Sequence, residues 1–431
     1  MKSFFEAEEQ RKLKPRAVVV GVYKKSSSGE EHNESLDEII SLCKTAGGRV
    51  VGRLTQYVDR FNSSTLIGSG KVDELSMLLS ERKANLIVID TILAPSQQMN
   101  LEKKLNVQVI DRPGLILDIF ALHAQTREAR AQVELAQFEY LLPRLAKGWT
   151  HLERQEGSIG TRGPGETQLE TDRRIIRQRI TDLKKKLKSI EGERHIQRKQ
   201  RKSLFKTCLV GYTNAGKSTL FNLLTGEDVL AENYLFATLD STTRKLKLSG
   251  KNEILVSDTV GFIKRLPVSL VASFKSTLLE VLDADLLLNV IDLSSDKYED
   301  DMNSVMEVLK EIKCDKIPMV HIFNKIDNRN EPDLFMSLLR KYPGSRFVSA
   351  LTGEGISNLI SSLENHKEGS NIIVIADIPA DQGEKMSMLG SFGHILDSTA
   401  ENNHLFLKVK IPQKSLGKLD QNNIDYKILD S

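Results

Sequence analysis

Over the first 110 residues, short apolar runs alternate with stretches in which apolar residues recur every three or four positions. The short runs have the length and the β-branched content of strands, and the longer stretches have the period of amphipathic helices. Strands that alternate with helices build parallel sheets, so this part of the chain predicts a small α/β domain. The predicted strands are residues 17–23, 50–58, 85–89 and 107–110, and the predicted helices are residues 35–45 and 71–81.

The next stretch has the pattern of two long helices that pack on each other. Its apolar positions step mainly by four and three, which is the spacing of a helix–helix seam. On the second helix they are Ile176, Ile180, Leu183, Leu187 and Ile190, and on the first helix Val133, Leu135, Phe138, Leu142 and Leu145. Residues 157–165 contain four glycines and one proline, so we expect a helical hairpin with a glycine-rich tip.

Beyond residue 204 the apolar runs again have the length of strands, and polar residues follow directly after them. The predicted strands here are residues 207–210, 253–256, 318–323 and 346–348, and the last segment carries two more at 372–375 and 405–409. The predicted fold is α/β: a central domain with a mostly parallel sheet flanked by helices, a small α/β domain with the hairpin before it, and a small α+β domain after it. The predicted boundaries are 1–125, 126–203, 204–367 and 368–431.

The net charge of +3 hides a strong asymmetry along the chain. Residues 172–206 contain fourteen Lys and Arg against four Asp and Glu, so this stretch carries +10 and the remainder carries −7. A dense basic helix without a matching acidic run favours contact with RNA over the alternative, a solvated charged face. In the hairpin tip, Arg154 and Arg162 can meet phosphates or stack on unpaired bases, and a plain flexible linker is the alternative.

The composition favours a cytoplasmic protein without a membrane span. The 431 residues exceed what one core serves, so several domains are expected. The first 14 residues are charged, and no run approaches the about 18 apolar residues of a membrane helix. Cys43, Cys208 and Cys314 match no metal-binding spacing, so we expect buried, reduced thiols.

A phosphate-binding loop of the form G-x-x-x-x-G-K-S follows the strand at 207–210 and precedes a helix predicted from residue 218. Its residues are Gly211, Tyr212, Thr213, Asn214, Ala215, Gly216, Lys217 and Ser218. In such a loop, backbone N–H groups and the positive end of the helix meet the phosphates. We expect Lys217 to reach the terminal phosphates and Ser218 to hold Mg²⁺. The strand-loop-helix setting therefore predicts a P-loop domain that binds a nucleoside triphosphate.

Two further segments indicate which base is bound. Asn324, Lys325, Ile326 and Asp327 follow the strand at 318–323, at the carboxyl end of a parallel strand, where ligands bind in open α/β sheets. The Asp327 carboxylate can accept hydrogen bonds from N1–H and the exocyclic amine of guanine, which adenine cannot donate. Ser349, Ala350 and Leu351 follow the strand at 346–348, and a backbone N–H there can meet the guanine carbonyl. The predicted nucleotide is GTP, although use of ATP as well stays open.

Residues 324–327 are the predicted base reader. The segments between the phosphate loop and this base reader have the pattern of nucleotide-sensing switches. Asp258, Thr259, Val260 and Gly261 follow the strand at 253–256. We expect Asp258 to hold Mg²⁺ through water and the Gly261 N–H to meet the γ-phosphate. Upstream, Phe236, Ala237, Thr238, Leu239 and Asp240 supply Thr238 as a second hydroxyl ligand of Mg²⁺. The predicted catalytic residues are Lys217, Thr238 and Gly261, and the predicted metal ligands are Ser218 and Thr238.

Phe262 stands where many GTPases carry a water-orienting glutamine, and a phenyl ring cannot orient water. We therefore expect slow intrinsic hydrolysis, with the missing group supplied by another segment or a partner, which elsewhere is worth about 10³ to 10⁵ in rate. Asn214 matches GTPases in which an asparagine helps to seat K⁺ beside the phosphates, so K⁺ is a candidate cofactor.

Some patterns carry less information. Residues 68–71 (Gly-Ser-Gly-Lys) resemble a truncated phosphate loop, and an ordinary helix start is the favoured interpretation. His394 and His404 have no partners at metal-binding spacing, so neither is assigned to a site.

Four segments ahead of the phosphate loop are more specific than the loop itself. They are residues 111–120 (Asp-Arg-Pro-Gly-Leu-Ile-Leu-Asp-Ile-Phe), 132–137 (Gln-Val-Glu-Leu-Ala-Gln), 148–155 (Gly-Trp-Thr-His-Leu-Glu-Arg-Gln) and 160–174 (Gly-Thr-Arg-Gly-Pro-Gly-Glu-Thr-Gln-Leu-Glu-Thr-Asp-Arg-Arg). With these segments the chain resembles the HflX family of ribosome-associated GTPases. The resemblance covers roughly residues 15–365 and is weaker beyond them.

The resemblance implies a Mg²⁺-dependent P-loop GTPase whose hairpin tip reaches the catalytic centre of the large ribosomal subunit. The implied function is rescue or splitting of stalled or idle ribosomes. A ribosome-assembly or RNA-remodelling GTPase is one alternative, and a signalling switch that recruits a protein partner is another. We expect a monomer that binds GTP, GDP and the large ribosomal subunit.

Overall fold

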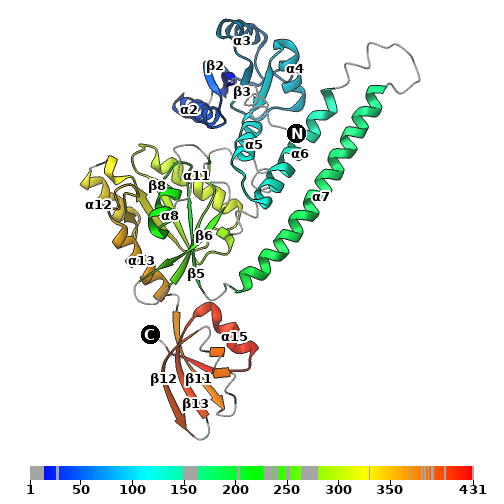
Figure 1. The fold of residues 1–431 in the computed structure, drawn as a ribbon. Helices are drawn as coiled ribbons and strands as arrows, with labels where there is room; N and C mark the ends of the chain where they lie inside the picture. Colours follow the sequence, from blue (N-terminus) through cyan, green and yellow to red (C-terminus); the bar gives the residue numbers. More distant parts are fainter. Residues whose placement is uncertain are drawn as a thin grey trace.

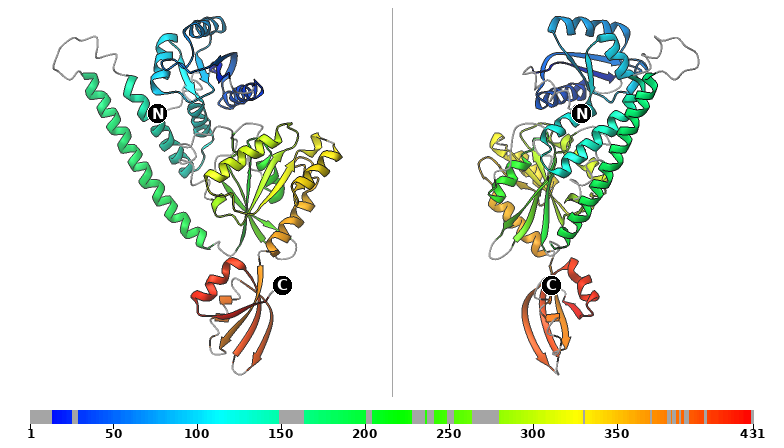
Figure 2. Two further views of the ribbon diagram at one scale, coloured as in Figure 1. Left: turned by 180° about the vertical axis from the view of Figure 1, so that it is seen from behind. Right: turned by 45° about the vertical axis from the view of Figure 1, so that its right-hand side comes forward.

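The computed structural model describes residues 14–25, 29–148, 164–200, 204–227, 236, 241–248, 253–263, 280–329, 331–369, 371–379, 382, 385–386, 388–389, 393–401 and 404–429. Figures 1 and 2 show three sheet-containing parts and a helical hairpin. The central part lies between the N-terminal part and the C-terminal part. The hairpin runs alongside the N-terminal part and the central part. These parts agree with the predicted fold class, while the domain boundaries stay predictions.

The N-terminal part is a four-stranded parallel sheet of order β2-β1-β3-β4. Val18 and Val20 of β1 pack in one core cluster, and Ala17 and Val19 pack in another. Both faces of β1 are therefore covered, which explains its continuous apolar run. The strands are β1 (Arg16–Lys24), β2 (Arg49–Val58), β3 (Leu86–Ile89) and β4 (Gln108–Asp111), and the helices are α2 (Gly29–Thr45), α3 (Ser69–Arg82), α4 (Pro95–Leu105) and α5 (Arg112–His123).

The four predicted strands and two predicted helices of this part are present, but α4 and α5 were not predicted. In α5, eight of the twelve residues are buried, so its sequence lacks the polar face from which an amphipathic helix is recognised. The resemblance of residues 68–71 to a phosphate loop is not supported, because Lys71 Nζ pairs with Glu74 at 2.8 Å along an ordinary helix start.

The hairpin consists of α6 (Arg127–Gly148) and α7 (Pro164–Gln200). Its observed seam joins Ala131, Leu135 and Phe138 of α6 to Ile180, Leu183 and Leu187 of α7. The prediction for Val133 was wrong, because this side chain packs in the core of the N-terminal part with Ala129 and Ala136. Helix α6 thus has two apolar faces, one for each neighbour. The tip residues Arg154 and Arg162 lie outside the described residues.

The central part is a six-stranded sheet of order β10-β9-β8-β5-β7-β6, parallel except for the β6–β7 pair. The four predicted strands are present, and β6 and β8 are additional. Its strands are β5 (Phe205–Gly211), β6 (Thr242–Lys247), β7 (Glu253–Asp258), β8 (Leu286–Asp292), β9 (Met319–Asn324) and β10 (Arg346–Phe347). Its helices are α8 (Lys217–Thr225), α11 (Tyr298–Glu311), η2 (Ile326–Asn328), α12 (Pro332–Lys341) and α13 (Ile356–Gly369).

The C-terminal part is a four-stranded antiparallel sheet of order β12-β13-β11-β14 with a short helix, as an α+β prediction requires. Its elements are β11 (Asn371–Pro379), β12 (His394–Glu401), β13 (His404–Pro412), η3 (Gln413–Ser415), α15 (Leu416–Gln421) and β14 (Asp425–Leu429). His404 Nδ1 lies 2.6 Å from Asp377 Oδ1 on the neighbouring strand β11. The three cysteines are buried and free, as predicted. None of the helices in the described part of the chain combines the length and the apolar character that crossing a bilayer requires.

Asp111 joins the N-terminal part to the hairpin. Its side chain is fully buried, and its two oxygens accept four hydrogen bonds. Oδ1 accepts from the Gly114 N–H at 3.0 Å and the Tyr140 hydroxyl at 2.6 Å. Oδ2 accepts from the Leu93 N–H at 3.0 Å and Arg144 Nη2 at 2.9 Å.

Replacing Asp111 by Ala should lower the free energy of unfolding by about 3–5 kcal/mol, because the partly buried Arg144 would lose its carboxylate partner and three further donors would lose their acceptor. The measurement is denaturant unfolding of the purified variant. The exposed Asp73 of α3 provides the control, since Asp73→Ala should change stability by no more than about 0.5 kcal/mol. Equal stability of the two variants would contradict this role for Asp111.

Candidate nucleotide-binding site

The phosphate loop leaves β5 and enters α8 through two glycines that no other residue can replace without distortion. Gly211 has a φ of +149°, and a Cβ there would lie 2.3 Å from the Val290 carbonyl oxygen. Gly216 has a φ of +91°, and a Cβ there would lie 2.2 Å from Asn324 Nδ2. The first contact brings the loop against the adjacent strand β8, and the second brings it against the predicted base reader.

Lys217 is folded back over the loop. Its Nζ donates hydrogen bonds to the carbonyl oxygens of Tyr212 at 2.6 Å and Gly211 at 3.1 Å. The residue is 6% exposed. Burial lowers the pKa of Lys217 to about 8, against the opposing effect of the Asp258 charge. An anionic phosphate beside this ammonium would therefore relieve an electrostatic cost of the fold.

Ser218 Oγ donates to Asp258 Oδ2 at 2.7 Å. This places a hydroxyl and a buried carboxylate side by side at the ends of the loop and of β7. Hard oxygen donors of this kind are the ligands that Mg²⁺ takes together with phosphates and water, so the residues fit such an ion. Thr238, with Ala237, Leu239 and Asp240, lies outside the described residues.

The segment after β7 pairs with the phosphate loop. The Thr213 N–H donates to the Phe262 carbonyl at 2.8 Å, and the Phe262 N–H donates to the Gly211 carbonyl at 3.0 Å. A Cβ at Gly261 would lie 2.9 Å from Thr213 Cα and 3.0 Å from Lys217 Nζ. Thr259 Oγ1 donates to the Leu209 carbonyl at 2.6 Å. The backbone of Gly261 is therefore held against the place where phosphates are expected.

Phe262 cannot take the place of a water-orienting side chain in this arrangement. Its residue is 4% exposed, and its ring packs in a cluster with Val210, Val281, Val305 and Leu309. The backbone hydrogen bonds on both sides of the residue fix that orientation.

Asn324 braces the base reader against the phosphate loop. Its Nδ2 donates to the Ala215 carbonyl at 2.9 Å, and its Oδ1 accepts from the Ala350 N–H at 2.9 Å. Ser349 Oγ donates to Asp327 Oδ1 at 2.5 Å, which orients an otherwise exposed carboxylate. Lys325 Nζ pairs with Asp292 Oδ2 at 2.6 Å. Leu351 is 81% exposed, so only its backbone is positioned near this edge.

Not every predicted switch residue faces the nucleotide edge. The Phe236 ring is buried in the core of the N-terminal part, 4.8 Å from the Phe120 ring in an edge-to-face contact. Val260 joins the same core, together with Ile263. The side chain of Ile326 packs beside Phe323 and Leu338. These side chains contribute to the hydrophobic cores, although their backbones lie in the segments predicted to bind the nucleotide.

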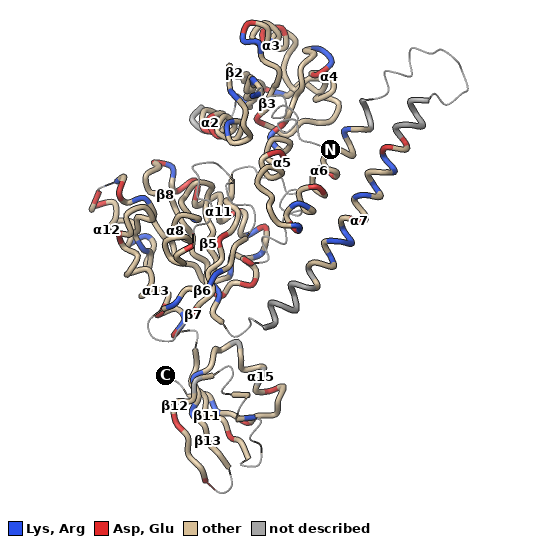
Figure 3. Tube along the Cα trace, viewed as in Figure 1, with Lys and Arg blue, Asp and Glu red and all other residues tan. Residues whose placement is uncertain are grey.

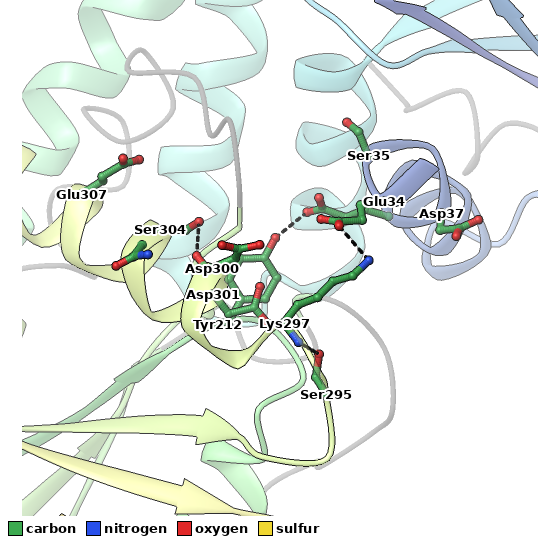
Figure 4. A pocket seen from close by; sticks show the side chains of 12 residues that line it. Glu34, Ser35, Asp37, Tyr212, Ser295, Lys297, Asp300, Asp301, Ser304 and Glu307 are labelled. Atoms are coloured by element: carbon green, nitrogen blue, oxygen red, sulfur yellow. Dashed lines mark hydrogen bonds and ion pairs between the residues drawn. The ribbon is translucent and has the colours of Figure 1, made fainter. Parts of the chain in front are cut away.

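Sequence patterns gave no sign that the N-terminal part would contact the phosphate loop. The Tyr212 hydroxyl donates to Glu38 Oε1 of α2 at 3.0 Å. Beside it, Lys297 pairs with Glu34 at 2.8 Å. Figure 4 shows the Tyr212 and Lys297 side chains reaching toward α2 in a pocket where six of the twelve lining residues are acidic side chains of α2 and α11. The positions that pair are far apart in the chain and match no motif.

Comparison with known proteins identifies the family. Residues 33–121 match a model described as GTP-binding GTPase N-terminal, residues 123–201 match GTP-binding GTPase Middle Region, and residues 206–325 match 50S ribosome-binding GTPase. The chain is 42% identical over 415 residues to a protein named GTPase HflX from Magnetococcus marinus, covering 95% of this chain and 96% of the relative. The chain belongs to the HflX family of GTPases. The resemblance found in the sequence is therefore confirmed.

Other relatives support the same assignment. The GTPase HflX of Flavobacterium psychrophilum is 51% identical over 312 residues, covering 72% of this chain and 75% of the relative. The GTPase HflX of Escherichia coli is 40% identical over 421 residues, covering 96% and 98%. Among solved structures, a GTP-binding protein from Sulfolobus solfataricus in complex with GDP aligns with a TM-score of 0.45 at 25% identity, covering 82% of this chain and 98% of that chain.

In this HflX chain, Gly216→Ala should weaken GDP binding by at least about tenfold. The added methyl group must enter the space of the Asn324 amide, and an alanine in this left-handed backbone costs roughly a further 1–2 kcal/mol. The measurement is a titration with fluorescent GDP.

The matched control is Gly47→Ala. Gly47 has a similar φ of +85°, but a Cβ there would meet nothing within 4 Å. The control should lose about 1 kcal/mol of stability and keep its GDP affinity. Unchanged affinity in Gly216→Ala would contradict the proposed brace between loop and base reader.

Proposed function

We propose that this GTPase binds the large ribosomal subunit through its basic hairpin and splits or rescues stalled or idle ribosomes. The observation that carries the proposal is the joining of phosphate loop and guanine reader by Asn324, in a segment that matches a 50S ribosome-binding GTPase model. We further propose that the protein acts as a monomer in the cytoplasm.

In the proposed site, the backbone N–H groups of residues 213–218 and Lys217 hold the phosphates, and Asp327 reads guanine. Ser218 and Thr238 would ligate Mg²⁺, with Asp258 behind them. That ion would neutralise the developing charge on the phosphates. Gly261 offers its N–H to the γ-phosphate, and the 349–351 backbone meets the guanine carbonyl.

The burial of Phe262 supports the proposal that the chain depends on help from outside for hydrolysis. We place that help on the ribosome, which would tie hydrolysis to arrival at the target. K⁺ seated beside Asn214 is a second source of positive charge. Asn214 is exposed and has a φ of +62°, so it stands at the open side of the loop. Equal turnover in potassium and sodium buffers would remove K⁺ from the proposal.

The basic surface of α7 supports ribosome binding by a nucleic-acid contact. Figure 3 shows Lys and Arg distributed along the described length of this helix. Two of them serve the hairpin itself, because Arg179 pairs with Glu134 at 3.0 Å and Lys184 pairs with Glu139 at 2.8 Å. Five further Lys and Arg in the described part of α7 are exposed, namely Arg174, Arg177, Lys185, Lys186 and Lys188. These are the residues proposed to face ribosomal RNA.

The central test is GTP turnover with and without isolated large ribosomal subunits, in potassium buffer. The subunit should raise turnover by roughly 10² or more, because a single positioned donor is already worth about that factor. Lys217→Ala should abolish both rates. A GTP turnover rate that is the same with and without the subunit would contradict the ribosomal proposal. A signalling switch that recruits a protein partner would then be the better candidate.

Replacing Lys185, Lys186 and Lys188 together by Glu should weaken binding to the large subunit. It should also flatten the dependence of log affinity on log salt by about 2, since each lost phosphate contact removes about 0.7–0.9 from the slope. The measurement is sedimentation binding at several salt concentrations.

The control for that variant is charge reversal at Lys310, Lys313 and Lys316, which are exposed in and after α11. It makes the same change in net charge at another place. If both triple variants lost affinity equally, the effect would be one of overall charge, and the hairpin would lose its proposed role.

A further inference from the structure

Tyr212 is the residue through which the phosphate loop contacts the N-terminal part by a hydrogen bond. Its hydroxyl donates to Glu38 Oε1 at 3.0 Å, while its carbonyl accepts from Lys217 Nζ at 2.6 Å. One residue thus links a carboxylate of α2 to the lysine that is expected to meet the terminal phosphates. Figure 4 shows the Tyr212 ring directed toward α2.

Glu38 is itself fixed by a buried ion network, which consists of Glu38, Arg112 and Asp90. Arg112 Nη2 lies 2.9 Å from Glu38 Oε1, and Arg112 Nη1 lies 2.8 Å from Asp90 Oδ1. The Arg112 and Asp90 side chains are 3% and 0% exposed. Since a buried charge that loses its partner costs several kcal/mol, these groups have few alternative arrangements. Glu38 therefore presents its carboxylate to Tyr212 from a rigid position.

The network lies where an α/β sheet ordinarily binds a ligand. Strand β1 has β2 on one side and β3 on the other, so the strand order reverses between β1 and β3. Ligands of open α/β sheets bind at the carboxyl ends of strands at that point. Asp90 follows β3 directly, and the Tyr23 hydroxyl near the end of β1 donates to Asp90 Oδ2 at 3.0 Å. In this protein, the phosphate loop of the central part is linked to that crevice through Tyr212 and Glu38.

We propose that Glu38, held by Arg112, is a positioning residue for GTP hydrolysis. Glu38 accepts a hydrogen bond from the Tyr212 hydroxyl and so holds Tyr212 in place. This also positions the Tyr212 carbonyl oxygen, to which Lys217 Nζ donates. The N-terminal part thereby completes the site for hydrolysis, in addition to packing against the central part. This role rests on GTP hydrolysis by the site proposed above, and it is independent of ribosome binding.

Docking of the two parts does not depend on this hydrogen bond. Phe236, Val260 and Ile263 of the central part are buried in the N-terminal core, and Lys297 pairs with Glu34 at 2.8 Å. Removal of the Tyr212 hydroxyl alone therefore leaves the apolar contact and the Lys297–Glu34 ion pair in place. A Tyr212→Phe variant therefore tests the positioning of Lys217 and leaves the docking of the two parts intact.

The experiment is single-turnover GTP hydrolysis by the full chain with enzyme in excess and without ribosomes. Tyr212→Phe should lower the rate constant by about three- to tenfold, the range that corresponds to the net contribution of a typical single hydrogen bond. The affinity for GDP should change by less than about twofold, because the backbone N–H groups of the loop still hold the phosphates.

The matched control is Tyr23→Phe. It removes a tyrosine hydroxyl from the far end of the same ion network, 3.0 Å from Asp90 Oδ2, where the Tyr23 ring stacks on His32 of α2 at 4.3 Å. This variant should lose stability while its rate constant stays at the parent value. Glu38→Gln, which keeps an acceptor oxygen, should slow hydrolysis, and adding Tyr212→Phe to it should slow hydrolysis less than Tyr212→Phe does in the parent.

Three outcomes would overturn the proposal. They are a parent-like rate constant in Tyr212→Phe, a raised one, and an equal loss in Tyr23→Phe. Lys217→Ala, measured alongside, separates this failure from failure of the site as a whole, because it must abolish hydrolysis if the phosphate loop is the active site.

Discussion

Two adjacent buried charges, Asp111 and Arg112, connect the N-terminal sheet to the hairpin and, through Glu38, to the phosphate loop. Asp111 accepts from Tyr140 and Arg144 of the hairpin, and Arg112 pairs with Asp90 of the sheet and with Glu38, which in turn holds Tyr212. Charges taken out of water must keep their partners, because an orphaned one costs several kcal/mol. The start of α5 therefore ties the hairpin to the N-terminal sheet, and through Glu38 it orients the Tyr212 side chain of the phosphate loop. The need for these two charges is a structural reason for the Asp-Arg-Pro-Gly segment that marks the family resemblance.

The apolar contact across the same interface connects the segment that contains Gly261 to the N-terminal part. Val260 precedes Gly261, whose N–H is proposed to meet the γ-phosphate, and Val260 is buried in the N-terminal core together with Ile263 and Phe236. A shift of Gly261 must therefore disturb side chains whose burial is worth about 1.5–3 kcal/mol each. Couplings between sites in proteins are typically about 1–3 kcal/mol. The interface is thus large enough in energy to make the arrangement of the N-terminal part depend on which nucleotide is bound, and the hairpin is tied to that part through α6.

The sequence correctly predicted the strands that precede the phosphate loop, the base reader and the segment after β7. The phosphate loop, the base reader and the segment after β7 are each a few residues long and follow recognisable strands, so their backbone geometry is local. What it missed depends on contacts between distant residues. Glu38 and Tyr212 are 174 positions apart, and no periodicity relates them. Helix α5 was not predicted because it is buried on nearly all sides. Val133 was assigned to the wrong partner because α6 has two apolar faces.

The position of Phe262 supports the proposal that GTP hydrolysis depends on a group supplied from outside this chain. Its backbone pairs with Gly211 and Thr213, and its ring belongs to the cluster that supports β5 and α11. A glutamine at this position would have to leave a hydrophobic core in order to reach water beside the phosphates, and that would cost the burial that now orders the segment. The same contacts that hold Gly261 against the phosphate loop therefore keep the next side chain away from the reacting water. We infer that the packing of Phe262 has two results. It holds Gly261 against the phosphate loop, and it leaves the site without a water-orienting side chain at this position.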